Sequence, residues 1–243
     1  MSSKILVLPG DGIGVEVADQ AIRVIEKLNE QGLNASYEKD LVGGASYDVN
    51  GEPLTNSVLE KAKNSDAVLL GAVGGSKWDD VERSKRPEAG LLGLRKELEL
   101  FANLRPALVF DALVSASTLK NEVVNNLDIM IVRELTGGVY FGQPRGIEDT
   151  PNGKKAIDTQ IYYDYEIDRI ARVAFDLARK RNNKVTSVEK ANVMETGVLW
   201  REIVKETHKD FSDITPVSYT HLTLPTTLQV YISVVGGAVK GGG

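Results

Sequence analysis

Uninterrupted apolar runs alternate with helical stretches in the first third of this chain. Lys4–Leu8 (KILVL) and Asp66–Val73 (DAVLLGAV) are apolar after their first residue, which is typical of parallel strands buried on both faces. From Val17 to Leu28 apolar residues recur at helical spacing, and Gly32 ends that helix. The alternation predicts an α/β fold in which helices cover a parallel sheet.

The same patterns continue downstream. Helices are predicted over Leu91–Leu100, over Tyr165–Lys180 with Asp164 as N-cap, and over Glu195–His208, and strands over Leu127–Val132 and Lys184–Val188. Residues 141–160 are rich in glycine, proline and charge, and they predict an exposed excursion of the chain.

Composition narrows the classes of function. A length of 243 residues suits one large α/β domain or two small ones. The net charge of −5 gives no electrostatic reason to expect nucleic acid or an anionic membrane as a partner. The absence of cysteine excludes disulfides, thiolate metal sites and a cysteine nucleophile. Because the N-terminus has no long apolar core, we expect no signal peptide or membrane span, and a cytoplasmic protein.

Three glycines follow the first apolar run, in LPGDGIGVE. A dinucleotide-binding fingerprint has the spacing G-x-G-x-x-G, with an acidic residue about 20 positions later at the tip of a second strand. Here the third glycine, Gly14, comes one position early, and Glu26 and Glu30 lie within or at the end of a helix. The stretch therefore predicts a tight strand-to-helix turn and not a Rossmann loop.

Three arginines stand in settings unusual for surface charges. Taken singly, Arg95, Arg105 and Arg133 would most often be solvated. Arg105, however, is fixed between a leucine and a proline, and Arg133 ends an apolar strand. Since guanidinium groups bind carboxylates bidentately, the set indicates a small substrate with more than one carboxylate.

Tyr140 and Lys190 are candidates for proton transfer. A lysine at the end of an α/β strand can act as a base when burial or charge lowers its pKa, and a tyrosine can donate a proton. Taken alone, each residue is more often structural or solvated. His208 lies at a helix end and His221 in an atypical C-terminal stretch, so no histidine chemistry is expected.

Five ordered motifs carry a family resemblance. They are LPGDGIG, GAVGGSKWD, PEAGLLGLRKELELFANLRPA, VRELTGGVYFGQPRG and VEKANVMETGVLWREIV. From about residue 4 to about residue 215, the chain resembles the isocitrate/isopropylmalate dehydrogenase family, and within it the branch that acts on 3-isopropylmalate in leucine biosynthesis. The resemblance implies a two-domain α/β fold that binds NAD without a Rossmann domain. It also implies Mg²⁺ or Mn²⁺ as a cofactor, and a homodimer.

The resemblance also implies roles for the candidate residues. Arg95, Arg105 and Arg133 would hold the malate carboxylates, Lys190 would take the hydroxyl proton, and Tyr140 would protonate the enolate carbon. The residues implied near NAD are Gly75, Ser76, Lys77, Trp78, Asp79, Pro87 and Glu88, with Asn192 near both the substrate and the nicotinamide.

An apolar wall favours one substrate within the family. Leu91, Leu92 and Val193 would surround an isopropyl group, whereas burying the third carboxylate of isocitrate against them would be costly. Tartrate and other alkylmalates stay open, because one methylene is weakly discriminated. By the same resemblance, Lys190, Asn192 and Val193 reach the neighbouring subunit's site, and residues 141–160 form an arm that clasps it.

The expected domains follow from the resemblance. Residues 1–104 would be the first part of a cofactor-side domain that is incomplete here, and residues 105–216 the substrate and dimerisation domain. Residues 217–243 contain no acidic residue and are expected to be a non-native tail. The family's metal-binding aspartates are expected beyond this chain, so no metal ligand is assigned within it. The activity is therefore expected of the parent enzyme, and this chain itself is expected to be inactive. The alternative function is that of a catalytically inactive fragment, or of a dicarboxylate-binding or dimerising module.

Overall fold

The computed structural model describes residues 3–219, and the chain divides into two compact units, Met1–Leu100 and Phe101–Gly243. The division lies four residues before the one expected after residue 104, which would fall inside strand β4 (Ala102–Leu108). Because β4 pairs along its whole length with β5 (Asp128–Glu134), it belongs entirely to the second unit.

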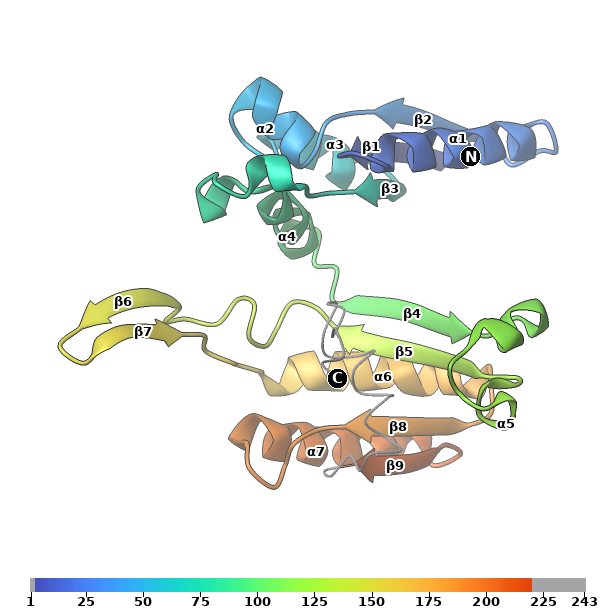
Figure 1. Ribbon diagram of the computed structural model, residues 1–243. Helices are drawn as coiled ribbons and strands as arrows, with labels where there is room; N and C mark the ends of the chain where they lie inside the picture. Colours follow the sequence, from blue (N-terminus) through green and yellow to red (C-terminus); the bar gives the residue numbers. More distant parts are fainter. Residues whose placement is uncertain (1–2, 220–243) are drawn as a thin grey trace. The chain divides into compact units, whose positions relative to one another are not determined.

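The first unit is a parallel three-stranded sheet with helices on both faces (Figure 1). Its strands, in the order β2-β1-β3, are β2 (Ala35–Lys39), β1 (Ser3–Gly10) and β3 (Ala67–Ala72). Its helices are α1 (Gly14–Asn29), α2 (Gly44–Asn50), α3 (Asn56–Lys63) and α4 (Pro87–Glu97), with short 3-10 turns at Ser76–Trp78 and Arg83–Lys85.

The central strand β1 is buried on both faces. Leu6 and Leu8 pack with Val58 of α3 and Leu94 of α4, whereas Val7 packs on the other face with residues of α1. This arrangement explains why the first strand is an uninterrupted apolar run, and it confirms the predicted parallel α/β class.

Over its described residues, the second unit combines three two-stranded sheets with three helices (Figure 1). Strands β4 and β5 are antiparallel, and β8 (Lys184–Val188) pairs in parallel with β9 (Thr215–Tyr219). The helices are α5 (Asn121–Val124), α6 (Asp164–Arg179) and α7 (Glu195–His208), with 3-10 turns at Asp111–Ala116 and Lys209–Phe211. The core gathers around Phe175 of α6, which stacks on Phe211 with ring centroids 5.1 Å apart.

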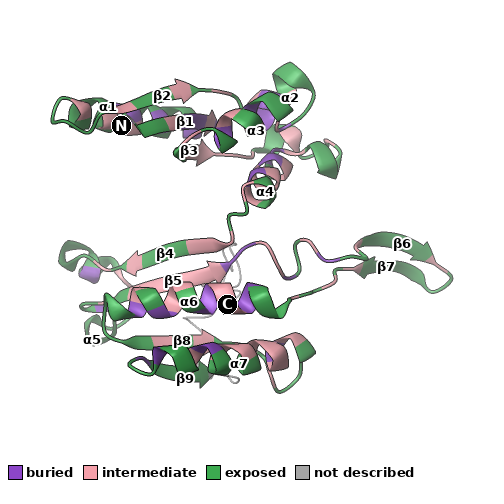
Figure 2. Ribbon diagram, turned by 180° about the vertical axis from the view of Figure 1, so that it is seen from behind, coloured by how far each residue is buried: buried purple, intermediate pink, exposed green. Residues whose placement is uncertain are grey.

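A hairpin extends from the second unit within the predicted excursion. Strands β6 (Gly146–Thr150) and β7 (Gly153–Ile157) pair only with each other, and most of their residues are exposed (Figure 2). The exposed hairpin is consistent with an arm, and its contact with a partner subunit stays a prediction.

Two helix predictions need correction at their ends. The helix expected over Leu91–Leu100 is α4, which begins at Pro87, a residue suited to the first helical turn, and ends at Glu97. Asp164 was wrongly expected to cap α6. The N-cap is Tyr163, whose backbone N–H donates to the carboxylate of Glu166 at 2.9 Å.

The stretch expected to be a non-native tail begins within a strand. Val217 and Ser218 continue β9 and pair with Thr186 and Ser187 of β8. Residues 220–243, including His221, lie outside the described part of the chain. Among residues 3–219, no helix combines the length and the apolar character needed to cross a membrane.

Candidate functional site

Asp11, which the sequence did not single out, organises the loops at the carboxyl edge of the first sheet. Its carboxylate is 4% exposed and accepts three backbone hydrogen bonds, from Gly44 at 2.9 Å, Ala45 at 2.7 Å and Gly74 at 2.9 Å. The first two donors are the first two residues of α2, and the third lies in the segment after β3. One side chain therefore joins the turn after β1, the start of α2 and the loop after β3, at the edge where open α/β sheets bind ligands.

The neighbouring glycines are required by close packing. A Cβ added at Gly14 would lie 2.2 Å from the Pro9 carbonyl oxygen and 2.5 Å from the Ala72 nitrogen. Gly10 has a φ of +74°, and a Cβ there would lie 2.0 Å from the Ala72 carbonyl oxygen. The glycines thus form the predicted tight turn from β1 to α1.

The residues implied near NAD occupy the loop after β3 and the start of α4. Gly75, Ser76, Lys77, Trp78 and Asp79 form one turn of this loop, and Pro87 and Glu88 open the helix. The Asp79 carbonyl accepts from Arg86 at 2.5 Å, and the same guanidinium donates to the Val81 carbonyl at 3.0 Å. The loop is therefore held by the residue that precedes α4.

Helix α2 holds two side chains of this loop. The Asp48 carboxylate accepts hydrogen bonds from the Lys77 ammonium at 2.6 Å and from the Trp78 indole N–H at 3.1 Å. These two donors lower the pKa of the Asp48 carboxyl below its usual value.

Helix α4 presents the predicted apolar residues and one arginine. Leu94 is buried in the core, and a Cβ at Gly90 would lie 2.6 Å from the Pro53 carbonyl oxygen, so the helix is seated closely. Leu91, Leu92 and Arg95 are half-buried on this helix, with Arg95 one turn beyond the two leucines.

Arg105 and Arg133 lie on one face of the β4–β5 pair. Asn103 is opposite Arg133 and Arg105 is opposite Ile131, so all four side chains share a face. The Arg105 Nε donates to Asn103 Oδ1 at 2.6 Å. This geometry brings together two of the three arginines that the sequence singled out.

Tyr140 completes this cluster. The Arg133 guanidinium carbon lies 5.4 Å from the centre of the Tyr140 ring, and the Tyr140 carbonyl accepts from Arg145 at 2.5 Å. Arg145 also contacts Asp158 at 3.2 Å, which ties the tyrosine to the base of the hairpin. Both Arg105 and Tyr140 are exposed, so a small anionic ligand could reach them.

A buried carboxylate supports the cluster from the opposite face. The Glu134 side chain is 1% exposed and accepts from the Gly137 backbone at 2.6 Å, from Thr136 at 2.8 Å and from Arg169 at 2.9 Å. Arg169 in turn lies over the ring of Phe101, 4.5 Å from its centre. Sequence reasoning missed this network, whose only signal was a charged residue next to Arg133.

The same loop packs against a half-buried tyrosine. A Cβ added at Gly138 would lie 2.5 Å from the Tyr162 hydroxyl. Burial and the nearby Glu134 raise the pKa of Tyr162. The loop that leads to Tyr140 is thus fixed by backbone contact as well as by hydrogen bonds.

Lys190, Asn192 and Val193 form the turn between β8 and α7. All three are exposed, and no hydrogen bond or ion pair joins Lys190 to Arg133 or Tyr140 in the described residues. The turn is closed by the Lys190 carbonyl, which accepts from the backbone of Met194 at 3.0 Å. A Cβ on Gly197 would lie 2.6 Å from the Lys190 carbonyl carbon, so α7 packs directly on this turn.

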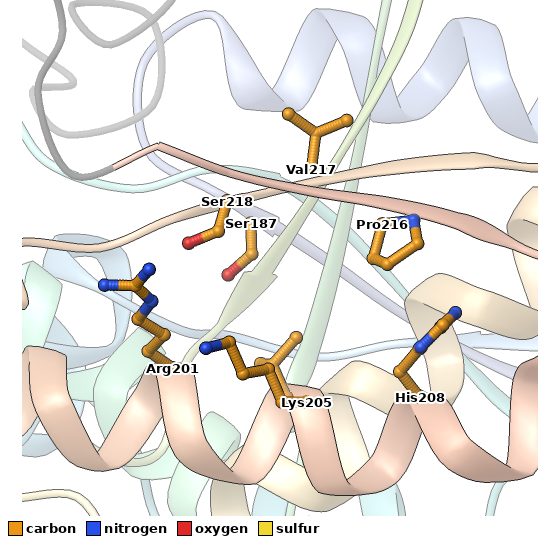
Figure 3. A pocket seen from close by; sticks show the side chains of 8 residues that line it. Ser187, Arg201, Lys205, His208, Pro216, Val217 and Ser218 are labelled. Atoms are coloured by element: carbon orange, nitrogen blue, oxygen red, sulfur yellow. The ribbon is translucent and has the colours of Figure 1, made fainter.

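Within residues 3–219 no group of three His, Asp or Glu side chains is placed to hold a metal ion. A hollow of about 150 Å³ lies between α7 and the strands β8 and β9, where Arg201 and Lys205 extend toward Ser187 and Ser218 (Figure 3). It contains none of the predicted site residues.

Comparison with known proteins identifies the family. The model of the isocitrate/isopropylmalate dehydrogenase family matches residues 4–228. A protein named 3-isopropylmalate dehydrogenase from Rhodopseudomonas palustris (strain BisB18) is 62% identical over 214 residues, which cover 87% of this chain and 58% of that protein. One of the same name from Chromohalobacter salexigens is 57% identical over 215 residues, covering 88% and 60%.

Solved structures agree with this match. The isocitrate dehydrogenase of Methylococcus capsulatus is similar with a TM-score of 0.69 and 30% identity, over 89% of this chain and 60% of that one. The apo β-decarboxylating dehydrogenase of Thermococcus kodakarensis gives 0.67 and 29%, over 95% and 60%. The chain thus spans about three fifths of the length of these relatives. The fold expected from the sequence motifs is confirmed, and the chain belongs to the isocitrate/isopropylmalate dehydrogenase family.

Proposed function

We propose that this chain takes part in the NAD-dependent oxidative decarboxylation of 3-isopropylmalate to 4-methyl-2-oxopentanoate, a step of leucine biosynthesis. The observation that carries the proposal is that Arg105 and Arg133 share a face of the β4–β5 pair and that Tyr140 lies against Arg133, in a chain whose relatives bear the name of that enzyme. Two guanidinium groups suit the binding of a dicarboxylate, and a phenol suits protonation of the enolate that remains after oxidation at C2 and loss of CO₂.

Each unit supplies its own part of this chemistry. In the second unit, Arg105 and Arg133 bind substrate carboxylates and Tyr140 returns a proton to the enolate carbon. Lys190 accepts the proton of the 2-hydroxyl group. In the first unit, Arg95 binds a carboxylate.

Apolar residues set the substrate preference. Leu91 and Leu92 lie one turn before Arg95 and are proposed to contact the isopropyl group, which Val193 reaches in the neighbouring subunit's site. A third carboxylate would lose its hydration against such a wall, which disfavours isocitrate.

The loop after β3 suits the nicotinamide half of NAD. It lies at the carboxyl edge of a parallel sheet, and near its start the backbone N–H of Gly74 donates to Asp11. Residues Gly75–Asp79 with Pro87, Glu88 and Asn192 are the proposed contacts. NAD supplies a hydride acceptor for C2 of the substrate.

The family resemblance implies Mg²⁺ or Mn²⁺, but the described residues do not form a cluster that would hold it. No step is therefore assigned to the metal in this chain. We further propose that the protein is a cytoplasmic homodimer in which the β6–β7 hairpin contacts the partner.

A chimera tests the proposal. Residues 4–215 replace the matching segment of the Rhodopseudomonas palustris relative, and NADH formation is followed at 340 nm with 3-isopropylmalate, isocitrate and tartrate. We expect turnover of 3-isopropylmalate above the other two substrates. A chimera that prefers isocitrate or tartrate would contradict the substrate assignment.

Two variants of the chimera test the residue roles. Lys190→Ala is expected to lower kcat at least about a hundredfold, the usual contribution of a general base. Leu91→Ser with Leu92→Asn is expected to lower kcat/KM for 3-isopropylmalate by about 10- to 200-fold. Normal hydride transfer in Lys190→Ala would remove that residue as the base. The unaltered 243-residue chain, assayed in parallel, separates an active enzyme from a non-catalytic binding or dimerising module.

A further inference from the structure

The loop that follows β3 has three separate attachments. Asp11 holds its beginning at Gly74, Arg86 holds the carbonyl groups of Asp79 and Val81, and Asp48 holds the side chains between them. Of the three, only Asp48 bonds to side chains of the loop, and it comes from a different element, α2.

The Asp48 carboxylate divides its two oxygens between two donors. Oδ2 lies 2.6 Å from the Lys77 ammonium and Oδ1 lies 3.1 Å from the Trp78 indole nitrogen. The Lys77 ammonium also lies 5.2 Å from the centre of the Trp78 ring. Two consecutive side chains are thus oriented by one acceptor.

The Trp78 ring packs against Gly44, the first residue of α2. A Cβ at Gly44 would lie 2.2 Å from the ring, and one at Gly75 would lie 3.2 Å from it. The ring therefore fills the space left by a missing side chain. We expect the hydrogen bond from the indole N–H to Asp48 to depend on this packing of the ring against Gly44.

Stability alone does not account for this contact. The side chains of Lys77 and Asp48 are 65% and 37% exposed, and ion pairs this exposed contribute little to the free energy of unfolding. The consequence of the contact is instead local, because it fixes where Lys77 and Trp78 point.

We propose that Asp48 is a positioning residue that holds Lys77 and Trp78 in the orientation needed to receive the nicotinamide half of NAD. The assignment rests on the proposed function for the ligand, whereas the positioning itself rests on the contacts of α2 with the loop. Asp48 does not touch the reacting atoms in this proposal.

The first test uses the chain itself with Trp200→Phe, which leaves Trp78 as the only tryptophan. Asp48→Ala is expected to shift the Trp78 emission to longer wavelength and to increase its quenching by acrylamide. Asp48→Glu is expected to restore both signals, since it keeps the carboxylate. The matched control is Asp19→Ala, which removes an exposed ion pair with Lys39, at 2.7 Å, elsewhere in the same unit.

Two further variants keep the test decisive. Asp48→Asn, checked by far-UV circular dichroism, replaces Asp48→Ala if the alanine variant does not fold. Gly44→Ala displaces the ring from its seat while leaving Asp48 in place. If Gly44→Ala changes the Trp78 emission and the Asp48→Ala or Asp48→Asn variant does not, the packing of the ring on Gly44 positions the loop, and the proposal is overturned.

The second test measures the cofactor in the chimera described above. Asp48→Ala is expected to raise KM for NAD about tenfold, equivalent to about 1.4 kcal/mol, with a much smaller change in kcat. An unchanged KM for NAD together with a shifted Trp78 emission would overturn the role toward the cofactor. Failure of the unsubstituted chimera to reduce NAD would instead count against the proposed function, and the fluorescence result would still decide the positioning.

Discussion

Replacing Glu134 by glutamine tests whether the buried network supports the arginine–tyrosine cluster. The glutamate is buried, and its two oxygens face three donors, from Gly137, Thr136 and Arg169. Glutamine has nearly the same shape but only one acceptor oxygen. Its amide N–H₂ must then face at least one of these donors, and Arg169 loses its closest counter-charge.

The expected cost can be worked from the geometry. Removing one partner of a buried ion pair costs about 3–5 kcal/mol, because the remaining charge is left without compensation. Arg169 retains 28% exposure and a second carboxylate, Glu166, at 4.0 Å. We therefore expect a loss near the lower end, about 3 kcal/mol in the free energy of unfolding.

Urea denaturation of the chain with Trp78→Phe measures this loss. Trp200 then reports on the second unit, since its ring lies 5.3 Å from that of Tyr162, which packs on Gly138. The matched control is Glu148→Gln, which removes an exposed pair with Lys155 at 2.9 Å. It is expected to cost about 1 kcal/mol or less.

The reasoning is refuted by equal effects of the two substitutions. If Glu134→Gln and Glu148→Gln both shift the unfolding free energy by less than about 1 kcal/mol, the buried carboxylate does not support the loop. A change in the denaturant slope without a change in midpoint would also count against it, since it reports a change in compactness.

Three other substitutions test separate parts of the fold. Phe175→Ala should destabilise the second unit by about 3–5 kcal/mol, because it empties the centre of the core; a loss near zero in urea would show that the site collapses. Gly197→Ala should destabilise by about 1–3 kcal/mol, since its Cβ would meet the Lys190 backbone; stabilisation, which alanine gives in an unobstructed helix, would contradict the close packing. Arg179 lowers the pKa of the Asp213 carboxyl to about 2, so this pair stabilises the fold above the unfolded pKa of about 3.9, and the contribution is lost as the pH falls toward 2. Asp213→Asn should therefore reduce the fall in urea midpoint between pH 5 and pH 2.5, and an unchanged fall would refute the assignment.

The elements predicted correctly from the sequence are those whose burial leaves a pattern. Strands β1 and β3 pack against helices, β1 buried and β3 half-buried, so their apolar runs were visible without any knowledge of pairing. Strand β4 was not predicted, because Arg105 and Pro106 interrupt its apolar character. Only the pairing with β5 shows that it is an edge strand, where proline is tolerated.

The residues of the candidate site also differ in whether a local sequence pattern could identify them. Arg105 and Arg133 could be chosen from their local settings, but their common face depends on the register of two strands. Asp11 could not be chosen, because its partners Gly44 and Gly74 lie 33 and 63 residues away. A carboxylate between two glycines gives no local sign of such donors.

The two carboxylates that hold the loop after β3 should respond differently to ionic strength. Asp11 is buried, and three backbone N–H groups stabilise its charge, so dissolved ions cannot reach the carboxylate or compete for its donors. Asp48 binds an exposed ammonium, and added salt screens that attraction. Concentrated salt should therefore loosen the middle of the loop while its beginning stays attached to the sheet, so that the same segment is rigid at one end and salt-responsive in its centre.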